Sequence, residues 1–290
     1  MAENRNGEYL TRAYAKINLC LDVLGKLENG YHTVKMIMQT VGIYDELTFR
    51  RTTGEICLTS DCGELPLDEH NLIYQAIRLM QEEYQIEEGV SVSLKKNIPI
   101  AAGMAGGSTD AAATLKAMNL LFDLKLPAQR LMELGLRLGA DVPYCVMGGT
   151  ALAEGIGEKL TALPKAPECI LLVAKPDISV STKYVYEHLD AADGVRHPDV
   201  DGMVAAIREG NLDGVTRRLG NVLECVTIEA YPVIDRIKRR MKELGARGSL
   251  MSGSGPTVFG IFQDGEGARK ACARMEKEGL ARQLFVTKLV

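Results

Sequence analysis

No apolar run in this 290-residue sequence is long enough to cross a bilayer. The longest, such as residues 169–174, fall far short of the roughly 20 residues that a spanning helix needs. The first 12 residues are polar and lack the apolar centre of a signal peptide, so we expect none. We therefore expect a cytoplasmic protein that does not enter a membrane.

Excess positive charge is missing as well. The 34 Lys and Arg residues are outnumbered by 38 Asp and Glu residues, which gives a formal net charge of −4. Such a balance offers no electrostatic reason to bind nucleic acid or an acidic membrane surface. We expect neither of these partners, and no feature of the sequence indicates an obligate protein partner.

Paired cysteines and metal-binding spacings are also absent. The seven cysteines are dispersed and odd in number, and the only close pair, Cys57 and Cys62, has no histidine or further cysteine at metal-ligand spacing. Reduced thiols in a cytosolic protein are the expected state. The sequence contains no internal repeat and no low-complexity tract.

What is present is typical of a globular protein. Apolar residues make up 46% of the sequence and charged residues 25%, and a chain of this length predicts about two domains. Prolines, lysines and alanines interrupt the pattern around residues 160–167, so we expect domains at 1–163 and 164–290. The fold class that we expect is α+β, with a mostly antiparallel sheet in the first domain and helices on one face of a sheet in the second.

Local patterns predict the main elements. Alternating or continuously apolar segments indicate strands at residues 9–25, 36–41, 46–50, 55–59, 90–94, 170–174 and 283–289. Helical spacing and propensity indicate helices at residues 72–84, 110–122, 127–139, 203–209, 212–219, 231–244 and 268–278.

The first strand carries a lysine within an apolar stretch. Alternation places Ala15, Ile17 and Leu19 on one face, and Lys16 and Asn18 together on the other. A lysine in such a strand commonly lies at an edge, with its ammonium in solvent. The residues alone leave open whether Lys16 has a partner.

Residues 99–109 form a loop of small residues between a strand and a helix. Ser108 and Thr109 are placed to cap the helix, and the small side chains leave the backbone N–H groups at its start accessible to a ligand. The electropositive end of a helix binds phosphate, although an ordinary tight connection explains the composition equally well. No Lys-Ser/Thr pair follows the glycines, so this is not a P-loop NTPase.

Two further stretches contain residues that could bind or react with a ligand. The turn at Asn29-Gly30-Tyr31-His32 places an aromatic ring beside an imidazole, a combination that packs in loops but could also bind a ring. Asp141 is the only charged residue between Arg137 and Glu154, and a carboxylate in such an apolar segment is costly to bury without a partner. The alternative is an exposed turn residue at a helix end.

Three motifs in this order resemble those of the GHMP small-molecule kinases. They are Ala15-Lys16-Ile17-Asn18-Leu19, then Pro99 with Gly106-Gly107-Ser108-Thr109-Asp110, and finally Gly253-Ser254-Gly255-Pro256-Thr257. The resemblance runs from about residue 9 to the end of the chain. It implies a two-domain GHMP kinase fold with the active site in the inter-domain cleft, and it implies ATP and Mg²⁺ as cofactors.

Within this superfamily, the Gly30-Tyr31-His32 turn and the Gly139-Ala140-Asp141-Val142-Pro143 segment resemble one branch. That branch phosphorylates the 2-hydroxyl of cytidine diphosphate-linked methylerythritol in the non-mevalonate route to isoprenoids. The expected partner is therefore this small molecule. The resemblance implies substrate-binding residues at Asn18, Tyr31, His32, Thr182 and Tyr186, with Tyr184 an alternative to Tyr186.

The resemblance also assigns the phosphate site and the catalytic pair. Lys16 and Asp141 match the catalytic residues, Ser108 is a candidate ligand of Mg²⁺, and Asp110 is either functional or a first-turn partner of the helix dipole. The second glycine-rich stretch, Gly253–Thr257, is expected to help order the phosphate loop. The matched cofactor-binding residues are Pro99, Ala101, Ala102, Gly103, Met104, Ala105, Gly106, Gly107, Ser108 and Thr109.

The chain departs from the family pattern where Ala101 and Ala105 replace common glycines. Alanine with a positive φ costs on the order of 1 kcal/mol or more, so we expect the loop to avoid that conformation. Two alternative functions are a sister kinase acting on mevalonate or homoserine and a catalytically silent ligand sensor. The Tyr31-His32 turn argues against the first, and the retained Lys16 and Asp141 argue against the second.

Overall fold

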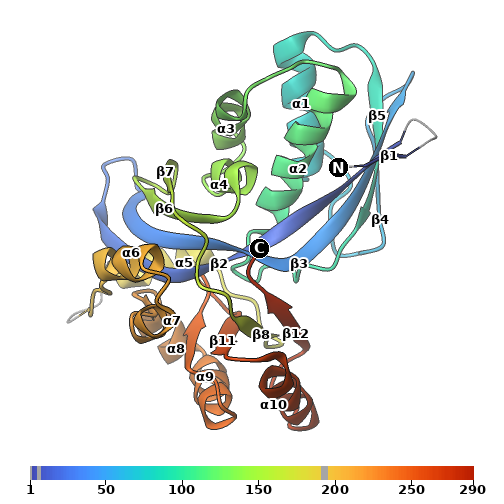
Figure 1. Ribbon diagram of the computed structural model, residues 1–290. Coiled ribbons are helices and arrows are strands. Elements are labelled where there is room, and N and C mark those ends of the chain that lie inside the picture. The colour runs from blue at the N-terminus through green and yellow to red at the C-terminus, as the bar shows by residue number, and fades with distance from the viewer. Residues whose placement is uncertain (1, 5–7, 191–194) are drawn as a thin grey trace. The chain divides into compact units, whose positions relative to one another are not determined.

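The computed structural model describes residues 2–4, 8–190 and 195–290, which form two compact units (Figure 1). Unit 1 comprises Met1–Ala15, Ile43–Ile98 and Ala105–Gly148, and unit 2 comprises Lys16–Gly42, Pro99–Met104 and Gly149–Val290. Two long strands, β2 (Glu8–Lys26) and β3 (His32–Thr52), contribute to both units.

The units are built from interleaved segments, whereas the expected domains divide the chain at one point. That point, between residues 163 and 164, lies inside unit 2, after β7 (Lys159–Ala162) and before β8 (Ile170–Lys175). The division into 1–163 and 164–290 thus stays a prediction about the family's domains.

Unit 1 is a sheet with helices gathered on one side of it (Figure 1). In the sheet, β3 pairs antiparallel with β5, with Glu46 opposite Lys95, and β4 pairs parallel with β5, with Cys57 opposite Ser91. Besides parts of β2 and β3, its elements are β1 (Ala2–Asn4), β4 (Cys57–Ser60), β5 (Gly89–Lys95), α1 (Leu72–Tyr84), α2 (Gly106–Leu121), α3 (Ala128–Leu136) and α4 (Val142–Met147).

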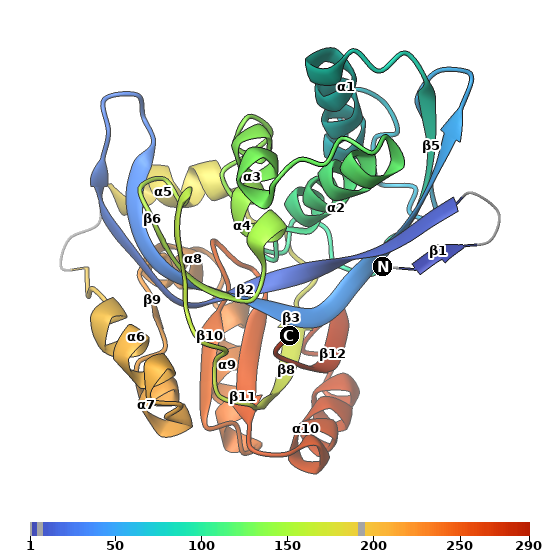
Figure 2. The same ribbon diagram turned by 45° about the horizontal axis from the view of Figure 1, so that its top comes forward.

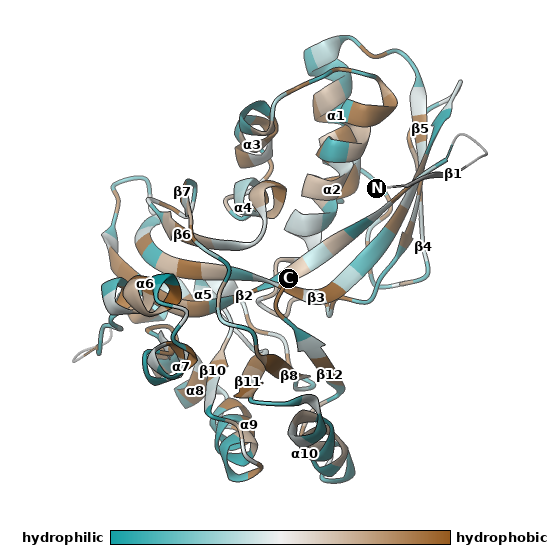
Figure 3. Ribbon diagram, viewed as in Figure 1, coloured by the Kyte–Doolittle hydropathy of each residue, from teal (hydrophilic) through white to brown (hydrophobic). Residues whose placement is uncertain are grey.

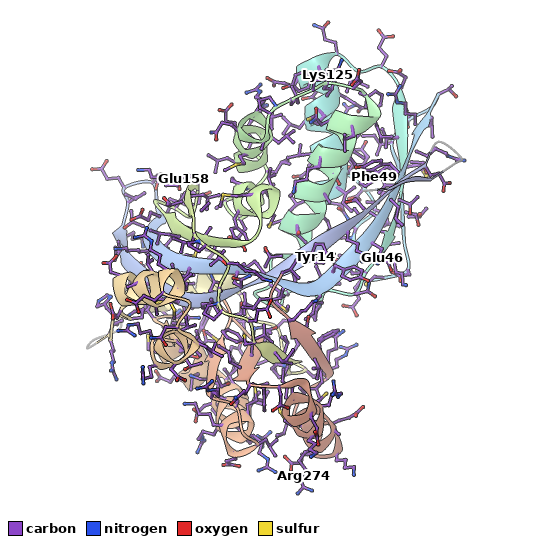
Figure 4. The ribbon with its side chains drawn as sticks, in the orientation of Figure 1. Tyr14, Glu46, Phe49, Lys125, Glu158 and Arg274 are labelled. Carbon is purple, nitrogen blue, oxygen red and sulfur yellow. The ribbon has the colours of Figure 1, made fainter. Side chains whose placement is uncertain are left out.

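Local sequence explains α1, whose bounds match the prediction. Asn71 caps the helix by accepting a hydrogen bond from Ile73 N at 2.9 Å. Its buried residues recur at helical spacing and pack into the unit 1 core, which also contains fully buried Phe49 (Figure 4).

Unit 2 contains a four-stranded antiparallel sheet in the order β10-β11-β8-β12. Helices α9 and α10 cover one face of it (Figure 2). In Figure 3 the strands β8 and β11 are mainly coloured as hydrophobic, while both helices contain many hydrophilic residues. The labelled Arg274 of α10 points away from the sheet in Figure 4. The elements are β10 (Gly248–Met251), β11 (Val258–Phe262), β12 (Gln283–Lys288), α9 (Val233–Glu243) and α10 (Gly265–Lys277).

The remaining elements of unit 2 pack around its parts of β2 and β3. Strand β6 pairs antiparallel with β3 and β7, and β9 pairs parallel with β2. Their bounds, with those of the other helices, are β6 (Thr150–Glu154), β9 (Gly220–Asn221), α5 (Thr182–Leu189), α6 (Val200–Arg208), α7 (Leu212–Arg217) and α8 (Glu224–Ala230).

Two local predictions are wrong. The two strands expected at residues 36–41 and 46–50 are one continuous strand, β3. The helix expected from residue 110 begins four residues earlier, at Gly106. In β2 both faces are buried from Ala15 to Val23, because the strand packs on both sides there.

Candidate active site

The start of α2 presents the predicted phosphate-binding end of a helix. The first intrahelical hydrogen bond runs from Thr109 N to Ala105 O at 2.9 Å. The N–H groups of Gly106, Gly107 and Ser108 come before it and therefore have no acceptor within the helix. Ser108 and Thr109 lie within the first turn rather than at the cap, and the Thr109 hydroxyl instead donates to Tyr14 O at 2.7 Å. The three N–H groups and the helix dipole form an anion-binding arrangement.

The loop does not avoid positive φ, contrary to the expectation. Ala101 has φ of 50° and Ala105, at the N-cap position of α2, has φ of 57°. Ala105 occupies this left-handed conformation because the chain must turn sharply from the loop into the helix. The protein therefore carries strain at two positions where glycine would be relaxed.

Ala105→Gly is expected to raise the free energy of unfolding by about 0.5–1 kcal/mol, because glycine adopts positive φ without strain. Chemical denaturation measures the change. Ala102→Gly is the matched control: Ala102 is a buried loop residue outside the positive-φ set, and its replacement should destabilise. Loss of stability in the Ala105→Gly variant would contradict the inference that the backbone is strained at Ala105.

Residues 99–104 of the loop are held by other segments of unit 2. The Ser252 hydroxyl donates to Gly103 O at 2.9 Å, and Lys16 N donates to Met104 O at 3.2 Å. Gly103 has φ of +70°, and a Cβ there would collide with Ser252 O and lie 3.0 Å from Gly255 O. The second glycine-rich stretch thus orders this part of the loop, as expected.

The second glycine-rich stretch is held by Asn221, a residue that sequence reasoning missed, and it contacts Thr182. Asn221 Nδ2 donates to Met251 O at 2.9 Å and to Gly253 O at 2.8 Å. The hydroxyl of Thr182, a predicted substrate residue, lies 2.9 Å from the Ser254 hydroxyl. No sequence signal links Asn221 to the turn, because the two are separated by a helix pair.

Lys16 is buried, so the solvated-edge interpretation is wrong. Lys16 is only 5% exposed, and its ammonium donates a hydrogen bond to Asn18 Oδ1 at 2.7 Å. Asn18 is fully buried, and its amide lies 3.2 Å from Met36 Sδ. β2 therefore presents the two predicted site residues as one hydrogen-bonded pair within unit 2.

Asp141 occupies the N-cap position of α4, a short helix that the sequence did not predict. Its carbonyl accepts a hydrogen bond from Cys145 N at 3.1 Å, while its half-buried side chain does not cap the helix. Asp141 belongs to unit 1 and Lys16 to unit 2, so their catalytic pairing stays a prediction.

A buried charge cluster lies beside the start of α2 in unit 1. Lys96 Nζ donates to Asp45 Oδ2 at 2.5 Å and to Asp110 Oδ2 at 2.6 Å, and all three side chains are at most 5% exposed. Asp45 Oδ1 also accepts from the N–H groups of Asn97 and Ile98 at 2.6 and 2.8 Å. The cluster joins the chain before the phosphate loop to the helix after it.

The cluster contains two carboxylates and one ammonium. Burial raises the pKa of the Asp110 carboxyl well above its usual value against the opposing pull of Lys96, and the neighbouring Asp45 raises it further. Burial alone would lower the pKa of Lys96, but the two carboxylates outweigh it and raise that pKa. Asp110 is thus a partner of Lys96, a pairing across the fold that the sequence did not reveal.

His32, Tyr186 and Asp190 meet at one end of α5 in unit 2. The imidazole of His32 is 7% exposed, and its ring centroid lies 4.9 Å from that of Tyr186. Asp190, the C-cap residue of α5, bonds His32 Nε2 at 2.7 Å. Of the two predicted aromatic residues, Tyr186 contacts the imidazole ring, whereas Tyr31 is 57% exposed.

Within the described residues, one group of three side chains has metal-ligand spacing: Asp68, Glu69 and His70. All three are exposed, and Asp68 bonds His70 within the turn before α1. A local turn explains this group, and we assign it no metal. None of the helices in the described part of the chain combines the length and apolar character that crossing a membrane requires.

Comparisons with known proteins identify the family. The GHMP kinases N terminal domain profile matches residues 71–149, and the GHMP kinases C terminal profile matches residues 203–281. A Lachnospira eligens protein named 4-diphosphocytidyl-2-C-methyl-D-erythritol kinase is 56% identical over 278 residues, covering 95% of this chain and 96% of that protein. A Clostridium acetobutylicum protein of the same name is 44% identical and covers 96% of this chain and 99% of itself.

Solved structures agree. A crystal structure of 4-(cytidine 5'-diphospho)-2C-methyl-D-erythritol kinase matches with a TM-score of 0.83 and 31% identity, over 97% of this chain and 99% of that one. A homoserine kinase from Cytophaga hutchinsonii shares the fold, with a TM-score of 0.78 and 22% identity over 100% of this chain and 96% of its own. This chain therefore belongs to the 4-diphosphocytidyl-2-C-methyl-D-erythritol kinase family, a branch of the GHMP kinases.

Proposed function

We propose that this chain transfers the γ-phosphoryl group of ATP to the 2-hydroxyl of 4-(cytidine 5'-diphospho)-2-C-methyl-D-erythritol, in the non-mevalonate route to isoprenoid precursors. The proposal rests above all on the 56% identity to a relative named for this substrate, spread over nearly the whole chain. Two features of the structure support the proposal. The N–H groups at the start of α2 suit the phosphates of ATP, and the His32–Tyr186 cluster suits the cytosine ring of the acceptor.

The phosphates of ATP would lie against the loop and the start of α2. The N–H groups of Gly106, Gly107 and Ser108 can donate to phosphate oxygens without displacing a helix bond. The small side chains from Ala101 to Gly107 allow close approach of the backbone. The other predicted cofactor-binding residues between Pro99 and Thr109 would form the rest of the same phosphate-binding site.

The start of α2 also offers an oxygen ligand for Mg²⁺, the hydroxyl of Ser108. Mg²⁺ prefers oxygen ligands and takes one or two from a protein, completing its shell with phosphate oxygens and water. The Ser108 hydroxyl, in the first turn of α2, is the protein oxygen that we propose. The bound ion would offset charge on the phosphates.

Lys16 and Asp141 would act on the reacting groups. Asp141 would accept the proton of the attacking 2-hydroxyl, and Lys16 would offset negative charge around the transferred phosphoryl group. Because phosphoryl transfer has a loose transition state, holding the hydroxyl in line with the phosphorus contributes as much as proton removal. The hydrogen bond from Lys16 to Asn18 would orient the ammonium for this role.

The acceptor would be bound by residues of unit 2. Asn18, which is buried and bonds Lys16, would lie close to the methylerythritol portion, and Thr182, beside Ser254, would offer its hydroxyl to the acceptor. Tyr31 and Tyr186 would contact the cytosine ring, with the exposed Tyr31 free to stack on it. His32 would hydrogen-bond the edge of the base.

Product analysis tests this function. Incubation with ATP, Mg²⁺ and the cytidylyl acceptor should yield one equivalent of ADP per acceptor and a new ³¹P resonance of a phosphomonoester. Coupling of the methylerythritol carbons to that phosphorus should place it on the 2-hydroxyl. A phosphorylated position other than this hydroxyl, or ADP release without acceptor modification, would contradict the proposal.

His32→Ala is expected to raise KM for the cytidylyl acceptor about 10- to 100-fold with a much smaller effect on kcat, because one buried base contact is lost. Steady-state kinetics with each substrate varied in turn measure both constants. KM for ATP is the internal control and should stay unchanged. A fall in kcat with KM unaltered would argue against base recognition by His32.

A further inference from the structure

The ring of His32 is fixed by a carboxylate that the proposed reaction does not use. Asp190 Oδ1 lies 2.7 Å from His32 Nε2, and Asp190 Oδ2 lies 2.6 Å from Lys26 Nζ. Helix α5 supplies both Tyr186 and its C-cap residue Asp190, whose N–H donates to Tyr186 O at 3.3 Å. One helix end therefore determines both the position and the bonding of the imidazole.

The bond to Asp190 determines which ring nitrogen of His32 carries hydrogen. The hydrogen bonds from Lys26 and then from His32 lower the pKa of the Asp190 carboxyl, so it is ionised and can only accept. His32 Nε2 must therefore be the donor. In the neutral imidazole, Nδ1 then has no hydrogen and can only accept.

Among the residues that the structure describes, Nδ1 of His32 has no hydrogen-bond partner. The described buried atoms that lack a partner do not include it, so this nitrogen is accessible from outside although the side chain as a whole is only 7% exposed. An accessible acceptor can bind a ligand that brings an N–H donor to it. In a pyrimidine, the amino group at position 4 of cytosine is such a donor, whereas uracil has a carbonyl oxygen there.

We propose that Asp190 is a positioning residue that sets the hydrogen-bonding edge of His32, so that the base pocket accepts a 4-aminopyrimidine and rejects a 4-oxopyrimidine. The inference rests on the proposed function, in which His32 contacts the base. A uracil in the same position would turn its oxygen toward the Nδ1 lone pair and leave both acceptors unpaired. Selectivity thus depends on a residue that need not touch the substrate.

Asp190→Asn tests the inference, because an amide can accept from Nε2–H or donate to a bare Nε2 and so permits both tautomers. The readout is kcat/KM for the cytidylyl acceptor and for its uridylyl analogue. The wild-type protein should prefer the cytidylyl acceptor by about 100-fold. The variant should reduce that ratio to about 10-fold or less, mainly through KM, with its thermal unfolding temperature retained.

Glu187→Gln is the matched control. It makes the same change from carboxylate to amide on α5, where Glu187 is 57% exposed and lies 3.8 Å from Lys183. Its selectivity ratio should equal that of the wild-type protein. Asp190→Glu, which keeps the carboxylate, should retain most of the preference. An Asp190→Asn ratio equal to wild type, or equal losses on both acceptors, would overturn the inference.

The imidazole ¹⁵N shifts of His32 in the wild-type protein provide a test that needs no variant. At a pH where the ring is neutral, Nε2 should show the shift of a protonated nitrogen and Nδ1 that of a bare one; the reverse would overturn the inference. Turnover of the cytidylyl acceptor without discrimination would also overturn it while leaving the proposed function intact. Absence of turnover with the cytidylyl acceptor would instead refute the proposed function.

Discussion

Asp141→Ala is expected to lower kcat for the cytidylyl acceptor by about 10³-fold, within the range for loss of a positioned general base. The methyl group can neither accept the proton of the attacking hydroxyl nor hold that hydroxyl in line. KM values should change little, since Asp141 acts on the reacting group and not on the base or the nucleotide. Steady-state and single-turnover kinetics measure the effect, with circular dichroism to verify the fold.

Asp235→Ala is a suitable control for the loss of a carboxylate. Asp235 lies in the first turn of α9, where it pairs with Arg239 at 2.9 Å and is 38% exposed. Its replacement should leave kcat within about twofold of wild type. Wild-type turnover in the Asp141→Ala protein would refute its assignment.

Lys16→Ala should cause a loss of similar size, and the double variant shows whether the two residues act together. If Lys16 and Asp141 serve one transition state, removing both should cost little more than removing either one. Independent roles would instead give losses that multiply. This comparison tests through function alone whether the two residues act on one reaction step.

Lys96→Met is expected to lower the free energy of unfolding by about 3–5 kcal/mol, because it leaves two buried carboxylates without their cation. Lys96 bonds both Asp45 and Asp110, and none of the three side chains is more than 5% exposed. Denaturant titration measures the loss. The same variant should weaken ATP binding, because the cluster joins residues on either side of the phosphate loop.

Asp110→Asn is the matched control for this cluster. It removes one of two carboxylates and leaves the Lys96–Asp45 pair, so the expected loss is much smaller than for Lys96→Met. One oxygen of Asp110, Oδ1, is buried without a hydrogen-bond partner among the described residues, which indicates that this carboxylate is poorly satisfied already. Equal losses in the two variants, or no loss in Lys96→Met, would contradict this account of the cluster.

The sequence predicts the elements whose causes are local. Helix α1 matches because its cap, Asn71, and its apolar spacing lie within the same 14 residues. The interruption expected near Gly42 is absent for a tertiary reason: a Cβ at Gly42 would lie 2.8 Å from Thr287 Oγ1 of β12. That glycine serves close packing inside a continuous strand, not a turn.

The site shows the same distinction. The helix start predicted to bind phosphate follows from small residues before a helix, but the positive φ of Ala101 and Ala105 leaves no signal in the sequence, because alanine ordinarily avoids that conformation. The partners of Lys96 lie 51 and 14 residues away along the chain, and Asp190 lies 158 residues from His32. Pairings over such separations leave no periodic signal in a single sequence.

The most direct test of the central claim is ADP release from ATP and Mg²⁺ with one acceptor at a time: 4-(cytidine 5'-diphospho)-2-C-methyl-D-erythritol, mevalonate, homoserine or galactose. We expect turnover only with the cytidylyl acceptor. Turnover with one of the other three acceptors would be consistent with the proposed phosphate-binding role of the loop, but it would contradict the proposed binding of cytosine by His32 and Tyr186. Folded protein that is silent with all four would contradict the assignment as a kinase and favour a ligand sensor.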